Sequence, residues 1–147
     1  MSAAGLVAYS PSVLGETGAV PLRRCPCGTG LPLAECCGRL HDGTAGAATA
    51  EQLMRSRYRA FVLGDAEYLL ATWHPTTRPR TLNLDAAVRW TGLDVLATTG
   101  GTLLASEGTV EFRAHYLRNG GAGSQHENSR FVRDDGHWRY LDGVSLS

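Results

Sequence analysis

The arrangement of the cysteines limits how the first part of this chain can fold. All four cysteines lie between Cys25 and Cys37, in the pattern Cys-x-Cys-x8-Cys-Cys. The surrounding segment, residues 23–43, is rich in glycine and proline and has too few large apolar side chains to build a core. Four thiolates in one short loop match the tetrahedral coordination of structural zinc, and metal binding would supply the folding free energy. The spacing therefore predicts a zinc-binding segment over residues 23–43, with no open coordination position.

Other chemistries of the cysteines stay open at this point. A disulfide knot would need an oxidising compartment, and a bridge between the adjacent Cys36 and Cys37 would be strained. A redox dithiol is typically a Cys-x-x-Cys pair in a βαβ pattern, and the spacing of iron–sulfur ligands also differs from this one. Four free thiols in a loop would be unusual, because free cysteine is usually buried. His41 follows Cys37 by one helical turn, which makes it an alternative fourth ligand.

Charge and composition limit the classes of partner and reaction. The formal net charge is zero, so the basic excess typical of nucleic-acid-binding proteins is absent. The chain contains no lysine, which excludes a Schiff-base or P-loop lysine. It has no apolar run of about 18 residues, the length that a membrane span needs. Residues 1–22 lack the basic start of a signal peptide, so we expect a flexible tail and a cytoplasmic protein.

Two helices are predicted after the cysteine segment. Thr49 starts a Thr-x-x-Gln capping box, from which a helix should run to about Leu63 and end at Gly64. Asp65 is placed to cap a second, shorter helix. Pro75 should end it, because the residue before a proline is pushed out of helical geometry.

The remaining sequence has the pattern of an antiparallel sheet. Runs rich in Val, Thr, Phe, Tyr and Trp predict strands over residues 87–98, 108–117, 125–133 and 137–146. A tight Asp-Gly turn should join the last two strands, and a looser glycine-rich link over residues 120–123 the middle two. Helices followed by such a meander predict an α+β domain over residues 44–147, with the sheet curled around its helices.

Alternation along the strands predicts which side chains face the helices. Glu127 and Ser129 share a face with Phe131, and Asp142 shares the face of two aromatic residues in the last strand. His126 points to the opposite face from Glu127, so the two residues do not form a catalytic dyad. The inner surface is thus expected to be aromatic with a few polar groups.

The cysteine segment closely resembles the SEC-C motif, through CPCGTG at residues 25–30 and CCG at residues 36–38. SEC-C is the short zinc module at the C-terminus of the SecA translocation ATPase and in many unrelated bacterial proteins. The motif ends in Cys-Cys or Cys-His, so the resemblance implies that Cys25, Cys27, Cys36 and Cys37 bind Zn2+. In SecA the module docks other macromolecules, which raises the expectation of a protein partner through the zinc module.

Segments beyond the motif are similar to the YchJ family of small bacterial proteins, over residues 23–143. They are LMRSRYRAF (53–61), WHP (73–75), RWTGL (89–93), HENSRF (126–131) and DGHWRYLDG (135–143). Members pair a SEC-C motif with a nuclear transport factor 2-like cone, in which a curved sheet wraps around helices and often leaves a pocket. The resemblance therefore implies this fold and a zinc cofactor, but it implies no reaction.

The predicted inner face of the cone defines a candidate pocket. Its expected residues are Tyr58, Trp73, His74, Trp90, Phe112, Tyr116, Glu127, Ser129, Trp138 and Tyr140. A carboxylate among aromatic rings can act as a general acid or base, which makes Glu127 the candidate catalytic residue. The competing interpretation is an ion pair between Glu127 and a buried Arg57, Arg59 or Arg89. His74 either caps the helix before it or lies at the pocket mouth.

Two functions follow from these residues. The first is a zinc-binding adaptor or binding module that recognises a protein or a small ligand. The second is a small-molecule enzyme of the hydratase, isomerase or hydrolase type, with Glu127 as acid or base. By analogy with other cones, a homodimer through the outer sheet face around Leu117 is also an expectation. No nucleic-acid or membrane partner is expected.

Overall fold

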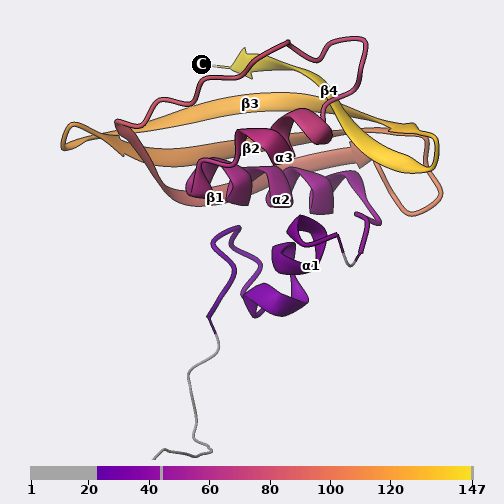
Figure 1. Cartoon of the computed structure of the whole chain (residues 1–147), viewed down its shortest axis with the longest axis horizontal. Coiled ribbons are helices and arrows are strands. Elements are labelled where there is room, and N and C mark those ends of the chain that lie inside the picture. The colour runs from indigo at the N-terminus through magenta and orange to yellow at the C-terminus, as the bar shows by residue number, and fades with distance from the viewer. Residues whose placement is uncertain (1–22, 44, 147) are drawn as a thin grey trace, which may run out of the picture.

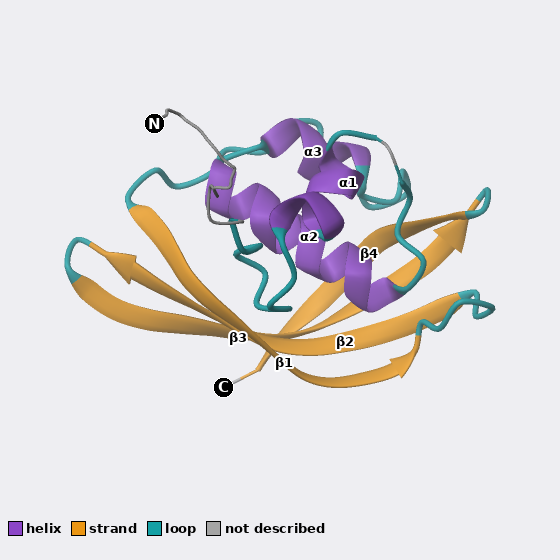
Figure 2. Cartoon of the chain, turned by 90° about the horizontal axis from the view of Figure 1, so that it is seen from below, coloured by secondary structure: helices purple, strands orange, loops and turns teal. Residues whose placement is uncertain are grey.

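The computed structural model describes residues 23–43 and 45–146, so the tail predicted over residues 1–22 lies outside the described residues. The elements are η1 (Leu33–Glu35, a 3-10 helix), α1 (Cys37–His41), α2 (Ala50–Leu63), α3 (Ala66–Ala71), β1 (Val88–Gly100), β2 (Glu107–Arg118), β3 (Gly121–Asp134) and β4 (His137–Leu146). The strands form one sheet in the order β1-β2-β3-β4, and every neighbouring pair is antiparallel. The sheet bends around α2 and α3, which lie on its concave side (Figures 1 and 2). The predicted α+β fold is thus confirmed.

The start and end of α2 are those that the sequence predicts. The Thr49 hydroxyl accepts a hydrogen bond from the Gln52 backbone N–H at 3.1 Å, and the Gln52 side chain in turn accepts one from Ala48 N–H at 2.8 Å. Gly64 ends the helix in the left-handed region, with φ of 73°, where glycine has no steric penalty. The capped helix presents its buried face, which includes Leu53 and Tyr58, to the sheet.

α3 begins as predicted but ends before Trp73. The Asp65 side chain caps it by accepting a hydrogen bond from Tyr68 N–H at 3.1 Å. After Ala71 the backbone pairs with β4 instead: Tyr140 N–H donates to Thr72 O, and His74 N–H donates to Tyr140 O, each at 2.8 Å. These bonds form a short parallel bridge between Trp73 and Tyr140, which draws the chain out of the helix and against the sheet.

Two tight turns connect the last three strands. Asp135 and Gly136, both with positive φ, join β3 to β4 as predicted. The link between β2 and β3 is a two-residue turn as well, because Asn119 and Gly120 have φ of 51° and 81°. The loose link predicted over residues 120–123 is therefore wrong, since β3 already starts at Gly121. Asn-Gly is a strong signal for this kind of hairpin turn.

Asp142 lies on the outer face of the sheet, contrary to the prediction from simple alternation. The register between β3 and β4 shifts between Arg130 and Phe131, so Arg130 pairs with Asp142 while Phe131 pairs with Tyr140. The bulge reverses the alternation of β4 at this point. The Asp142 carboxylate forms an exposed ion pair with Arg130 at 2.6 Å, which lowers the pKa of Asp142.

The cysteine segment packs directly beneath α2 and joins the hydrophobic core (Figure 1). Cys25, Cys27 and Cys37 are buried, in one cluster with Leu53 and Leu93. The cysteine segment is therefore part of the main hydrophobic core. None of the helices in residues 23–43 and 45–146 is long and apolar enough to cross a membrane.

Candidate functional site

The four cysteines come together as one group of metal-binding size. Their Sγ atoms all lie within 4.8 Å of one another, with 3.5 Å between Cys27 and Cys36 and 3.9 Å between Cys36 and Cys37. All four are free thiols. Tetrahedral zinc with Zn–S bonds of about 2.3 Å needs Sγ–Sγ separations of about 3.8 Å. The donor set and its spacing thus fit a tetrahedral, sulfur-binding metal.

The thiols also form hydrogen bonds with one another. Hydrogen bonds from Cys25 and then Cys37 hold the pKa of Cys27 well below its usual value. The pKa of Cys37 is raised, first by its hydrogen bond to Cys25. A metal takes thiolates as ligands, so binding would replace these shared protons. The four residues could hold a metal and give it structural, fully protein-ligated coordination.

His41 is directed away from the cysteines. Its Nε2 lies 2.6 Å from the Ser56 carbonyl oxygen, and its ring stacks on Tyr68 with 4.1 Å between ring centroids. A carbonyl only accepts, so Nε2 carries the proton and donates. Burial lowers the pKa of His41, which favours the neutral ring. The structure therefore groups Cys37, and not His41, with the other three cysteines.

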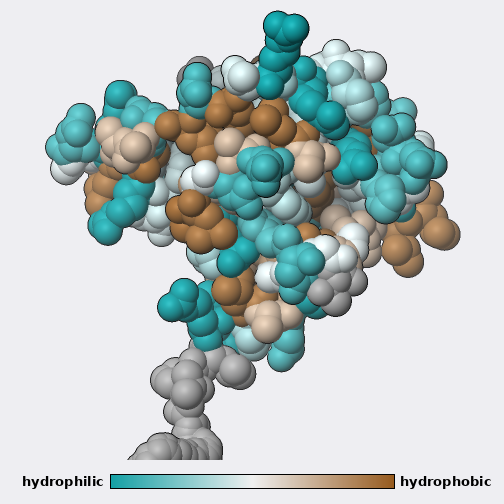
Figure 3. All heavy atoms as spheres, in the orientation of Figure 1, coloured by the Kyte–Doolittle hydropathy of each residue, from teal (hydrophilic) through white to brown (hydrophobic). Residues whose placement is uncertain are grey.

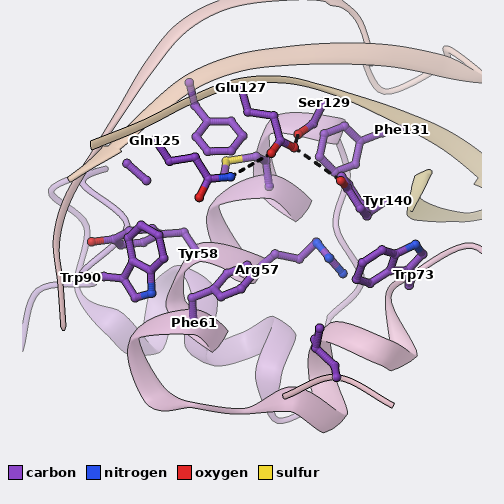
Figure 4. Close-up of a pocket in the computed structure, with 14 residues that line it drawn as sticks. Arg57, Tyr58, Phe61, Trp73, Trp90, Gln125, Glu127, Ser129, Phe131 and Tyr140 are labelled. Carbon is purple, nitrogen blue, oxygen red and sulfur yellow. Dashed lines mark hydrogen bonds between the residues drawn. The ribbon is translucent and has the colours of Figure 1, made fainter. Parts of the chain in front are cut away.

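A cavity of about 140 Å3 lies between α2 and the sheet (Figure 4). Seven residues that the sequence placed in a pocket line it: Tyr58, Trp73, Trp90, Phe112, Glu127, Ser129 and Tyr140. The structure thus brings together residues from α2, the segment after α3, and all four strands.

Three residues expected in the pocket lie elsewhere. His74 uses its ring Nδ1 to contact Thr76, because the bridge to β4 turns the chain at this point. Tyr116 packs edge-on behind Trp90, with 5.4 Å between ring centroids, and so lies outside the cavity wall. Trp138 is held away from the cavity by a hydrogen bond of 3.2 Å from its Nε1 to Ala48 O. The alternation of side chains along a strand predicts which face of the sheet a residue lies on, but not whether that part of the face lines the cavity.

Glu127 is held by three neutral donors. Ser129 Oγ donates to Glu127 Oε2 at 2.6 Å, Tyr140 OH donates to the same oxygen at 3.4 Å, and Gln125 Nε2 donates to Oε1 at 3.0 Å. Burial and the nearby negative charge of Glu127 raise the pKa of Tyr140 to about 12, which keeps this hydroxyl a donor. Within the described residues, Glu127 forms no ion pair with an arginine, so the competing interpretation from the sequence is not observed.

Arg57 is the second charged group of the cavity. Its side chain is buried, and its Nη1 donates to Leu69 O and to Thr72 Oγ1, each at 2.7 Å. The guanidinium carbon lies 4.4 Å from the centroid of the Tyr140 ring and 5.2 Å from that of Trp73. Burial lowers the pKa of Arg57 to about 10, so the side chain remains a cation at neutral pH.

Several lining residues were missed by the sequence prediction. Met54, Arg57 and Phe61 recur at three- and four-residue spacing on α2, together with Tyr58, and this helical period could have identified them. Gln125 lies two residues before Glu127 in β3 and so shares its face. Leu82, Ala114 and Phe131 complete the wall.

The cavity adjoins a second hollow beside the segment before β1. Both are lined by Phe61, Leu82 and Trp90, so these three side chains lie between the cavity and the outer hollow. Val62 and Leu63 also line this hollow and are exposed. The space-filling view shows hydrophobic residues gathered beside the helix pair on this side (Figure 3). Hydrophobic side chains thus continue from the cavity to the surface on this side of the cone.

Comparison with known proteins identifies the family. The model of the middle, nuclear transport factor 2-like domain of YchJ matches residues 49–143. The chain belongs to the YchJ family. It is 57% identical over 127 residues to a UPF0225 protein of Streptomyces coelicolor, covering 86% of this chain and 99% of that protein. A UPF0225 protein of Corynebacterium glutamicum is 50% identical over 121 residues, covering 82% and 96%.

Two solved structures match most of this YchJ-family chain. The solution structure of a SEC-C motif-containing protein from Rhodopseudomonas palustris superposes with a TM-score of 0.75 at 35% identity, covering 85% of this chain and 100% of that one. The crystal structure of a SEC-C motif-containing protein from Psychrobacter arcticus gives 0.68 at 32% identity, covering 85% and 84%. The resemblance to a SEC-C protein with a nuclear transport factor 2-like cone is thus confirmed.

Proposed function

We propose that this protein binds a small molecule in the cone cavity and that its four cysteines hold a structural zinc ion. The observation that carries the proposal is a preformed aromatic cavity with two charged groups, Arg57 and Glu127, which make no ion pair with each other within the described residues. Sites for small ligands are typically apolar clefts with a few well-placed polar groups. Free thiols at all four cysteines are in keeping with the cytoplasm.

Small-ligand binding is preferred over docking of a protein through the zinc segment. Cys25, Cys27 and Cys37 are buried, and Arg55 Nη1 donates to the Cys27 carbonyl at 2.7 Å, which binds the segment to α2. Because the cone covers one side of the zinc segment, we favour a structural role for this segment over a docking role.

Elemental analysis of the purified chain tests the metal. We expect about one zinc per chain, because four thiolates complete a tetrahedral site. Cys36→Ser should lower the zinc content, while Thr29→Ala, beside the same thiols, should retain it. Iron with a visible chromophore in place of zinc would contradict the assignment.

Calorimetric titration with a panel of neutral and charged single-ring compounds tests the cavity. We expect at least one to bind the wild-type chain. Ala114→Leu, which fills the cavity from β2, should abolish that binding while leaving the circular dichroism spectrum unchanged. A wild-type chain that binds no member of the panel would refute small-ligand binding.

Catalysis in the same cavity is a second candidate function. It is supported by Glu127, a carboxylate on the cavity wall that has hydrogen-bond donors but forms no ion pair among the described residues. Such a group can move a proton to or from a bound ligand. Glu127→Gln should then keep ligand binding but stop conversion of the ligand, as followed by mass spectrometry. Equal conversion by both proteins would exclude Glu127 as the acid or base.

A further inference from the structure

The hydrogen-bonding groups left unused in the cavity indicate which ligands it accepts, provided that the proposed binding of small molecules holds. Arg57 is only 5% exposed and lines the cavity. Its Nη1 makes two hydrogen bonds, but Nε and Nη2 have no partner among residues 23–43 and 45–146. None of the carboxylates in this part of the chain forms an ion pair with Arg57.

A buried cation with free donors favours an anionic ligand group. Removing a charge from water is costly unless hydrogen bonds and an opposite charge compensate for it. The rings of Tyr140 and Trp73 supply part of this compensation through cation–π contacts, and Glu127 attracts the guanidinium without forming an ion pair with it. The planar guanidinium can still offer Nε and Nη2 side by side, which is the geometry that binds a carboxylate with two hydrogen bonds.

The polar side chains of β3 that line the cavity, Glu127 and Gln125, instead favour a ligand group that donates a hydrogen bond. Glu127 Oε1 accepts a single hydrogen bond, from Gln125, and therefore has a free lone pair. The Gln125 amide oxygen has no partner in the described part of the chain and points away from Glu127 (Figure 4). Two acceptors, one of them negatively charged, favour a hydrogen-bond donor and repel a second anionic group.

Cavity size and wall chemistry limit the body of the ligand. The cavity volume is about 140 Å3. An apolar protein cavity of about 150 Å3 holds one benzene molecule. Phe61, Trp90 and Phe112 supply aromatic walls, against which a ring packs well.

We propose that the cavity binds a small carboxylic acid built on a single ring. Its carboxylate accepts hydrogen bonds from Arg57, and a hydroxyl or amino group at its far end donates to Glu127 or Gln125. Dicarboxylic acids are excluded by the charge of Glu127.

Calorimetry with matched ligand pairs on the full, metal-loaded chain tests this proposal. Benzoate and benzamide have nearly the same shape but differ in charge, and we expect benzoate to bind at least about tenfold more tightly because a charged hydrogen bond replaces a neutral one. We also expect 4-hydroxybenzoate to bind more tightly than 4-fluorobenzoate, which cannot donate. A 4-fluorobenzoate that binds equally well would overturn the donor half of the proposal.

Two arginine variants test whether Arg57 causes the preference for benzoate over benzamide. Arg57→Gln should remove the difference between benzoate and benzamide, whereas Arg59→Gln, two residues away on α2 and outside the cavity wall, should keep it. If Arg57→Gln does not fold, the wild-type comparison decides alone. Equal binding of benzoate and benzamide by the wild-type chain overturns the carboxylate proposal while small-ligand binding stands. If neither these probes nor any other single-ring compound binds, both proposals fail together.

Discussion

At the scale of single residues, the position of Glu127 depends on the absence of a side chain at Gly143, which pairs with Ser129. Gly143 lies on β4, and a Cβ atom at this position would overlap the Glu127 carboxylate. Gly123 has the same role for Tyr116, whose ring would lie 2.7 Å from an added Cβ. The carboxylate therefore occupies space that only glycine leaves open, beside its donors Ser129 and Tyr140.

Gly143→Ala should lower the free energy of unfolding by about 1–3 kcal/mol, the usual cost of overpacking a filled site. The cause is the clash with Glu127, so the same change should cost much less when Glu127 is already alanine. Chemical denaturation of the two single variants and the double variant measures this coupling. Strictly additive effects would show that Glu127 does not fill the space over Gly143.

The buried imidazole of His41 makes a prediction about pH. Burial lowers the pKa of His41 in the folded chain, whereas the unfolded chain has the usual value of about 6.5. The unfolded state therefore binds more protons as the pH falls through about 6.5, and stability decreases there. His41→Gln keeps a donor for the Ser56 carbonyl but does not titrate, so its stability should vary less between about pH 7.5 and 5.5. Identical pH dependence in urea denaturation of the two proteins would contradict this.

At the scale of elements, the hairpins and the bridge after α3 determine the shape of the cone. The Asn119–Gly120 turn leaves all of β2 paired with β3 without a register shift. The bulge between Arg130 and Phe131 and the bridge from Trp73 to Tyr140 then bring β4 over the cavity. Tyr140 is held at the point where it contacts both Arg57 and Glu127.

Gly120→Ala should destabilise the protein by about 1 kcal/mol, because alanine is strained at a φ of 81°. An added Cβ meets no atom within 4 Å, so the effect is purely one of the backbone. Gly46→Ala is a matched control, since Gly46 also has open space but no positive φ, and it should have little effect. Thermal denaturation of both variants compares them. Equal stability would argue against a strained turn.

At the scale of the whole molecule, the cysteine segment and the cone share one core. Cys25, Cys27 and Cys37 pack with residues of α2 and β1, and His41 stacks on Tyr68 of α3. The contacts from Arg55 to Cys27 O and from His41 to Ser56 O connect the segment to α2 at the two residues just before Arg57. Metal loss is therefore expected to affect the cavity as well.

Removal of the metal with a chelator should lower the melting temperature of the entire chain by about 10 °C or more, in a single transition. The reason is that binding free energy at the cysteines is folding free energy for the shared core. Tryptophan fluorescence reports on the cone, because all three tryptophans lie there. An unchanged fluorescence transition after complete metal removal would show that the cone folds independently.

Much of this protein follows from local patterns in its sequence. The capped helix ending at Gly64, the Asp135–Gly136 turn and the face shared by Glu127, Ser129 and Phe131 all depend on neighbouring residues, so local chemistry was enough to predict them. The four cysteines were predicted to act together because they lie close in the chain.

Other features depended on contacts between distant segments. The outward turn of Asp142 results from a bulge against β3, and the exclusion of Trp138 from the cavity results from its bond to Ala48. Arg57 and Glu127 line the same cavity without forming an ion pair because of the way α2 packs on the sheet. Residue periodicity along the helix or along a strand does not specify that packing. The sequence alone thus determined which residues are aromatic, charged or metal-binding and which face they share. Only the tertiary structure decided which of them meet, because packing between helix and sheet determines their relative positions.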